Sequence, residues 1–170
     1  YNVRLFSIYA LARTRPLNEH SADKLLPFSQ DEDPKIRESS IQSLGFYTMF
    51  PSKAEAIFEA QQRLSKDENS EVRRITCYSL GVYGKHSLRK EVIDELIRML
   101  GDSVYNVRWQ AMDALGEIGA SSRSSLPKLE IIAKNVEEEP EIRETAEDVI
   151  DAIRTGKKYE PKYTYKHLIR

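Results

Sequence analysis

The stretch DSVYNVRWQAMDALGEIG (residues 102–119) decides the fold of this chain. Counted from Arg108, the apolar residues at positions −1, +4 and +7 recur with the period of an amphipathic helix. Small residues at +3 and +6 and a glycine at +8 lie in the same helix. Because a glycine inside a helix costs about 1 kcal/mol relative to alanine, its presence predicts close packing against a neighbouring helix.

The same helix recurs along the whole chain. Its aliphatic–Arg pair returns at intervals of 33, 36, 35 and 35 residues, at Val3-Arg4, Ile36-Arg37, Val72-Arg73, Val107-Arg108 and Ile142-Arg143. Between the copies lie second helical segments, clearest at 52–65 and 87–100. Since neither helix of such a pair can bury its apolar face alone, the pairs are predicted to stack into an all-α solenoid with a continuous core.

The repeated pattern, an acid six residues before the Arg and A-x2-A-L-G after it, resembles the HEAT repeat in the short form named after phycobilisome lyases. Residues 102–119 match it nearly letter for letter, and 67–84 and 31–47 match with Ser or Thr in place of Ala. The resemblance covers residues 1–156 and implies a right-handed α-α superhelix of the HEAT/armadillo type, with about four to five helix pairs. In this family the acids and arginines form a structural ladder between repeats. The resemblance therefore implies structural roles for Asp31, Arg37, Asp67, Arg73, Asp102, Arg108, Glu137 and Arg143.

The chain is predicted to divide into a solenoid, 1–156, and a basic and aromatic tail, 157–170. The first copy of the repeat starts three residues before its Arg, which predicts that the chain begins inside a repeat and is truncated. Residues 130–151 hold nine acids and two bases, whereas 154–170 hold six bases and one acid. Terminal repeats need polar cover, so the tail is predicted to fold back on the last repeat as a cap. Binding of an acidic partner or RNA by the tail is the alternative.

Composition excludes several classes of function. The formal net charge of −1 argues against a dedicated duplex binder, which needs an excess of Lys and Arg. No apolar run approaches the roughly 18 residues of a membrane span. Cys77 is the single cysteine, so no intramolecular disulfide forms and a cytoplasmic location is expected. It stands where other copies have Ile41 or Met112, which predicts a buried apolar residue.

No catalytic motif, metal site or cofactor site is predicted. HEAT-like hydroxylases bind two irons through His-Glu dipeptides, and His20, His86 and His167 form none. Gly-rich phosphate loops and serine-nucleophile motifs are also absent from the sequence. The sequence therefore favours a non-enzymatic protein.

The functional prediction concerns the residues that vary between copies. The resemblance implies that the Arg-bearing helix lines the concave face of the solenoid, with positions +1, +2 and +5 facing the groove. Aromatic residues and Arg in such positions are typical of protein-interface hot spots. The predicted partner-binding residues are Leu5, Phe6, Tyr9, Arg74, Ile75, Tyr78, Trp109 and Gln110. The same side chains can instead cover neighbouring helices.

A scaffold or adaptor that binds another protein or peptide along this face is the predicted function. Two alternatives stay open: a subunit related to phycobilin lyases that holds a chromophore, and nucleic-acid binding through the Lys/Tyr tail.

Overall fold

The structure, a computed structural model, describes residues 2–13, 17–87 and 90–162, and within these ranges it is built from helices without strands. The α-helices are α1 (Asn2–Arg13), α2 (His20–Leu25), α3 (Pro34–Leu44), α4 (Pro51–Leu64), α5 (Ser70–Ser87), α6 (Lys90–Met99), α7 (Tyr105–Ile118), α8 (Leu126–Lys134) and α9 (Pro140–Thr155). Short 3₁₀ helices extend three of the turns, at Leu26–Gln30, Gly45–Met49 and Gly119–Ser125.

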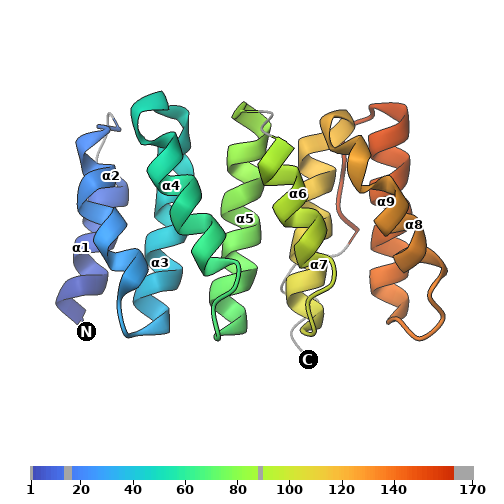
Figure 1. The fold of residues 1–170 in the computed structure, drawn as a ribbon, viewed down its shortest axis with the longest axis horizontal. Helices are drawn as coiled ribbons and strands as arrows, with labels where there is room; N and C mark the ends of the chain where they lie inside the picture. Colours follow the sequence, from blue (N-terminus) through green and yellow to red (C-terminus); the bar gives the residue numbers. More distant parts are fainter. Residues whose placement is uncertain (1, 14–16, 88–89, 163–170) are drawn as a thin grey trace.

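The helices form two layers (Figure 1). The Arg-bearing helices α1, α3, α5, α7 and α9 stand side by side, and each contacts the next along the row. Helices α2, α4, α6 and α8 lie in front of them in the view of Figure 1. Four helix pairs followed by α9 thus stack in sequence order, which confirms the predicted all-α solenoid.

Side-chain caps organise the loops that lead into α3 and α5. Asp33 Oδ1 accepts a hydrogen bond from the Lys35 amide at 2.8 Å and caps α3. Asn69 Oδ1 accepts one from the Glu71 amide at 3.0 Å at the start of α5. Both caps satisfy amides that the first turn of a helix leaves without partners. The two capping residues, Asp33 and Asn69, stand four residues before Arg37 and Arg73, so they start α3 and α5 at the same point of the repeat.

The core lies between the two layers, and it is built from the columns that the repeat predicts. The −1 residues Ile36, Val72, Val107 and Ile142 are fully buried. Cys77 is fully buried as predicted, and burial raises the pKa of its thiol far above the ordinary value. A buried neutral thiol of this kind acts as a small apolar side chain.

The two end surfaces of the solenoid differ. On α1, Val3, Phe6 and Ala10 are exposed, although the residues of their columns are buried in the later copies. On α9, the outward columns hold Glu147 and Asp151, both exposed, where earlier copies have apolar residues or glycine. One end is therefore apolar and the other charged.

Candidate functional site

A row of side chains at position +5 marks the exposed side of α1, α3, α5, α7 and α9. We call this side the inner face and define it by one residue per repeat: Tyr9, Gln42, Tyr78, Asp113 and Asp148. Tyr9 is 48% exposed and Tyr78 is 37% exposed. Gln42 is exposed as well, whereas Asp113 and Asp148 are partly buried. Because the five residues come from equivalent positions of stacked repeats, they lie along one strip.

The other predicted binding residues do not all share this strip. Trp109 is only 4% exposed and belongs to the hydrophobic core, and Ile75 is buried as well. The prediction that they line an open groove is wrong for these side chains. Position +2 is buried in α3, α5, α7 and α9, so Ile75 and Gln110 are enclosed by the stack.

In the first repeat the predicted binding residues are more exposed than the predicted binding residues at the same positions of later repeats. Phe6 is 74% exposed and Leu5 is half-buried. In the later repeats the residues at the same position as Phe6 are buried between repeats. Phe6 therefore belongs to the apolar end surface with Val3 and not to the strip around Tyr78. The structure therefore separates the predicted set into a strip, a buried group and an end surface.

Two of the buried residues, Arg74 and Gln110, form hydrogen bonds that lead to Asp113 of the strip. Arg74 is buried; its Nε donates to Glu71 at 3.0 Å and its Nη1 donates to Gln110 Oε1 at 3.3 Å. Gln110 Nε2 in turn donates to Asp113 Oδ2 at 3.1 Å. This chain of hydrogen bonds fixes the Asp113 carboxylate relative to α5 and α7.

Asp113 carries the perturbed carboxylate of the inner face. Burial raises its pKa to about 6, and the neighbouring Glu117 adds to the shift. The hydrogen bond from Gln110 and the charge of Lys85 act in the opposite direction. Lys85 itself pairs with Glu117. A cationic group brought to this site would stabilise the ionised form of Asp113.

A shallow hollow of about 170 Å³ connects these groups to Tyr78. It lies between α5 and α7, and its lining residues are Tyr78, Gly81, Val82, Lys85, Asp113 and Glu117. An aromatic ring beside two carboxylates is suited to a basic or aromatic side chain of a partner.

The first residues of the tail reach the inner face at its far end. The segment that follows α9 runs back along the gap between α7 and α9 (Figure 1). Tyr159 is 6% exposed, and a Cβ placed on Gly116 would lie 2.8 Å from the Tyr159 ring. Lys162 Nζ lies 3.0 Å from Asp148 Oδ1. These contacts support the predicted fold-back of the tail, while Tyr163, Tyr165 and His167 lie outside the described residues.

The acid–Arg ladder is present and runs from each Arg to the acid of the following repeat. The nearest atoms are 2.7 Å apart for Arg4 and Asp31, 2.8 Å for Arg37 and Asp67, and 2.7 Å for Arg73 and Asp102. The Nη1 atoms of Arg37, Arg73 and Arg108 also donate to backbone carbonyls of their own loops. The ladder residues therefore join repeats and order the loops.

The last rung departs from the prediction. Arg108 pairs with Glu138, and Glu139 lies 3.2 Å away, whereas Glu137 is exposed. The loop before α9 places its second glutamate in the position that Asp31, Asp67 and Asp102 take in the other loops. Beyond that rung, Arg143 Nε is buried without a hydrogen-bond partner.

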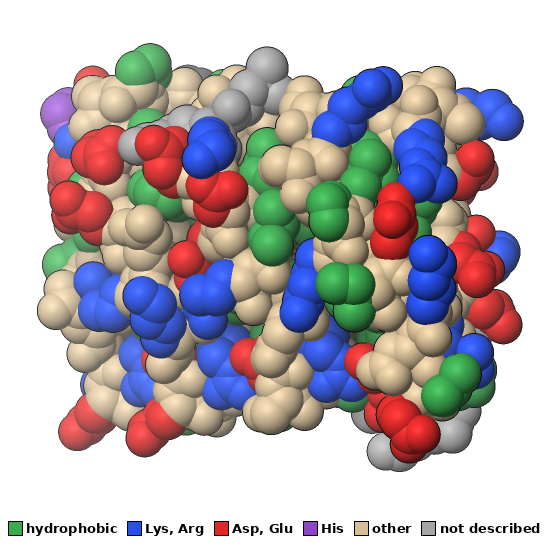
Figure 2. All heavy atoms as spheres, turned by 45° about the vertical axis from the view of Figure 1, so that its right-hand side comes forward, with side chains coloured by type: hydrophobic (Ala, Val, Ile, Leu, Met, Phe, Trp, Pro, Cys, Tyr) green, Lys and Arg blue, Asp and Glu red, His purple; other side chains and the backbone are tan. Residues whose placement is uncertain are grey.

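A second ladder links the helices of the other layer, and the repeat pattern around the Arg-bearing helices did not predict it. Arg63 Nη2 donates to Ser29 Oγ at 2.8 Å, and Arg98 Nη2 donates to Ser65 Oγ at 3.0 Å. In both copies the Arg stands four residues before the ladder acid and the Ser two residues before it, a spacing that could have revealed the pair. Figure 2 shows Lys and Arg side chains in a row across the lower part of the molecule, in keeping with the basic last turns of α2, α4, α6 and α8.

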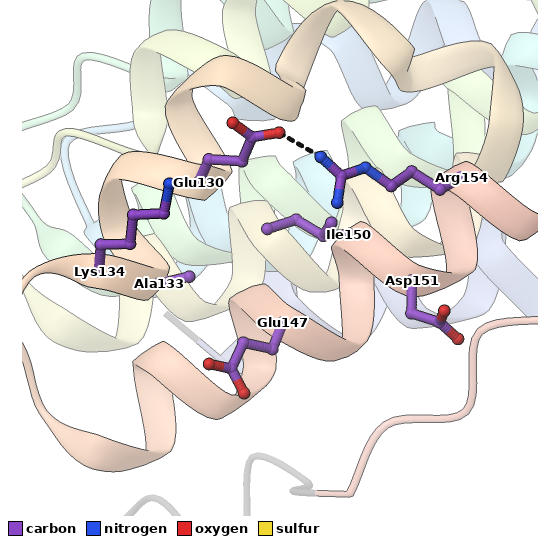
Figure 3. Close-up of a pocket in the computed structure, with 7 residues that line it drawn as sticks. All are labelled: Glu130, Ala133, Lys134, Glu147, Ile150, Asp151 and Arg154. Atoms are coloured by element: carbon purple, nitrogen blue, oxygen red, sulfur yellow. Dashed lines mark hydrogen bonds and ion pairs between the residues drawn. The ribbon is translucent and has the colours of Figure 1, made fainter.

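Another hollow lies between α8 and α9 (Figure 3). It has a volume of about 410 Å³ and a mostly charged lining, in which Glu130 and Arg154 point toward each other and pair at 2.5 Å. Glu147 and Asp151 stand on its α9 side. These groups form the charged end surface of the solenoid and do not converge on one point.

Two features are absent from the described part of the chain, a cluster of metal ligands and a helix that could span a membrane. No group of three or more His, Cys, Asp or Glu side chains there could hold a metal ion. No described helix is both long and apolar enough to cross a membrane. His20 and His86 lie on different helices, and His167 is outside the described residues.

Comparisons with known proteins agree with this architecture. The family model of HEAT repeats matches residues 57–151. Among solved structures, an engineered protein is 18% identical with a TM-score of 0.56, over 81% of this chain and 64% of that one. A designed armadillo repeat protein in complex with the peptide (KR)4 is 15% identical with a TM-score of 0.57, over 86% of this chain and 73% of that one.

The chain thus spans 64% of the length of the engineered protein that it resembles. No curated protein matches it. The short phycobilisome-lyase subtype stays a prediction. Because the family model covers more than half of the residues, and the ladder and the two-layer stack are those of the family, the chain belongs to the HEAT-repeat family.

Proposed function

We propose that this protein is a non-enzymatic scaffold that binds an extended segment of a partner protein along the inner face. The observation that carries the proposal is the strip at position +5, where Tyr9, Gln42 and Tyr78 are exposed at equivalent positions of successive repeats. Exposed tyrosines combine a large apolar surface with a hydroxyl group and lose little entropy on binding. An exposed amide between them can pair with the backbone of a bound segment.

Charge on the inner face indicates the chemistry of that segment. Asp113, Glu117 and Asp148 lie at the α7–α9 end, with Lys85 and Lys162 as the bases paired nearby. A partner segment that carries Lys or Arg would complement these carboxylates. The designed armadillo repeat protein of similar fold holds the basic peptide (KR)4, which is in keeping with this proposal.

Selection of displayed random peptides on the protein tests the proposal. We expect the selected peptides to be enriched in Lys, Arg and aromatic residues, and the double variant Tyr9→Ala/Tyr78→Ala to bind them at least tenfold more weakly. Both side chains are exposed, so the variant should unfold at the wild-type urea concentration. Ile131→Ala on α8 removes an exposed apolar side chain from the other layer and serves as the matched control. Unchanged affinity of the double variant would refute binding along the inner face.

The pH dependence of binding gives an independent arm of the same test. Asp113 has a pKa near 6, and Gln110, Glu117, Lys85 and Tyr159 are the polar groups around it. Because a basic peptide favours the carboxylate, its affinity should rise as the pH increases from 5 to 7. Asp113→Asn should flatten this rise.

A further inference from the structure

The contact between α7 and α9 differs from the other contacts in its layer. A Cβ placed on Gly81 of α5 would lie 2.9 Å from Ala114 Cβ, so α5 and α7 meet directly at this glycine. Gly116 is the equivalent glycine of α7, and the Tyr159 ring fills the space beside it. The α9 residue in the column of Ala114 is the larger Val149. A separate segment thus occupies a position that elsewhere belongs to the next helix.

One polar atom beside this gap lacks a hydrogen-bond partner. Asp148 Oδ2 is buried and unpaired, although Oδ1 of the same carboxylate binds Lys162. A buried unpaired polar atom costs about 1–3 kcal/mol. The gap therefore offers one acceptor that the tail does not satisfy.

The tail buries one side chain in the gap. Among residues 156–162, only the Tyr159 side chain is buried, and the lysines on either side of it are exposed. Segments with little buried apolar surface open at a small fraction of the global unfolding free energy. Release of the tail would therefore expose the Tyr159 ring and the side of Gly116 that it covers.

We propose that residues 157–162 are a ligand in cis. The gap between α7 and α9 is a site for an extended segment that carries a tyrosine followed three residues later by a lysine, and the tail covers this site until a partner segment of the same chemistry displaces it. Tyrosine enters beside Gly116, and lysine pairs with Asp148. This inference rests on the proposed function, because it names the partner chemistry for one end of the inner face.

A labelled peptide with the sequence GKKYEPK of residues 156–162 is the probe. In the unaltered protein the tethered tail competes at a high effective concentration, so binding of the peptide in trans should be weak. Tyr159→Ala removes the cis anchor and leaves the site intact, and its affinity for the peptide should be at least tenfold higher. A peptide with Ser in place of the Tyr should bind neither protein. Fluorescence anisotropy measures each affinity.

A second variant keeps the test decisive if Tyr159→Ala does not fold. Lys162→Glu retains the buried ring but places a negative charge beside Asp148, and it should raise the peptide affinity at least threefold. Equal affinities of the unaltered protein and both folded variants would overturn the inference, as would absence of binding to both. Tyr9→Ala combined with Tyr159→Ala should bind the peptide as Tyr159→Ala does. Loss of random-peptide binding can therefore be told apart from loss of this site.

Discussion

At the scale of single residues, the Arg73–Asp102 pair shows how the ladder joins repeats. Arg73 Nε and Nη2 donate to the two carboxylate oxygens of Asp102 at 2.7 and 3.0 Å, and both side chains are largely buried. Burial by itself raises the pKa of Asp102, but the hydrogen bonds from Arg73 and the Val104 amide outweigh it and hold the pKa below its usual value. A bidentate pair of this kind is both strong and directional.

Arg73→Met should lower the free energy of unfolding by about 2 kcal/mol at pH 7, because it leaves a buried carboxylate without its partner. Since the pKa of Asp102 is lowered in the folded state, its contribution is present at neutral pH and is lost as the pH falls below about 4. The difference between wild type and variant should therefore shrink in acid. Urea unfolding at several pH values measures it.

Lys90→Met is the matched control for this prediction. Lys90 pairs with Asp94 at 3.3 Å on the exposed surface of α6, where an ion pair contributes about 0.5 kcal/mol at most. Equal losses in the two variants would mean that the ladder is no more than a set of surface ion pairs.

At the scale of elements, the glycine of the repeat sets the distance between neighbouring helices. The recurrence of glycine at +8 predicts close packing, and the structure shows its cause. A Cβ on Gly81 would lie 2.9 Å from Ala114 Cβ and 3.2 Å from its Cα, so the obstacle includes the backbone of α7. The Gly45 position meets Ser79 of α5 in the same way.

Gly81→Ala should lower the free energy of unfolding by about 1–3 kcal/mol, because α5 and α7 must move apart. Helix propensity alone would favour alanine by about 1 kcal/mol, so a loss of stability identifies the contact as its cause. Gly101→Ala is the control: the contact its Cβ would make is with the Arg98 carbonyl oxygen at 3.4 Å. Its stability should stay within about 0.5 kcal/mol of wild type. A stable Gly81→Ala protein would contradict the packing explanation.

At the scale of the whole molecule, repetition made the fold predictable from the sequence. Arg37, Arg73 and Arg108 each occur with the same neighbours, so one helix predicts the others and their stacking order. The assignment of Glu137 to the last rung failed because three consecutive glutamates fit the spacing equally well, and the loop conformation selects Glu138. The aligned sequences of the repeats do not show which conformation this loop adopts.

The binding residues were harder to predict for a related reason. The position of a residue within the repeat shows which side of its own helix it occupies. It does not show whether another helix or segment covers that side. Trp109 is enclosed in the core although its column varies, whereas Tyr78 stays open. The site of Tyr159 depends on a segment outside the repeat, so no column predicts it.

The apolar end surface allows a test of the stack itself. Val3 and Val72 occupy the same column, yet Val3 is 79% exposed on α1 and Val72 is fully buried between repeats. Val72→Ala should lower the free energy of unfolding by about 2 kcal/mol, because it removes two buried methyl groups and leaves a cavity. Val3→Ala should change it by less than about 0.5 kcal/mol. Urea unfolding at two protein concentrations measures both, since a large cost for Val3→Ala that grows with concentration would show that the α1 surface is covered by a second molecule.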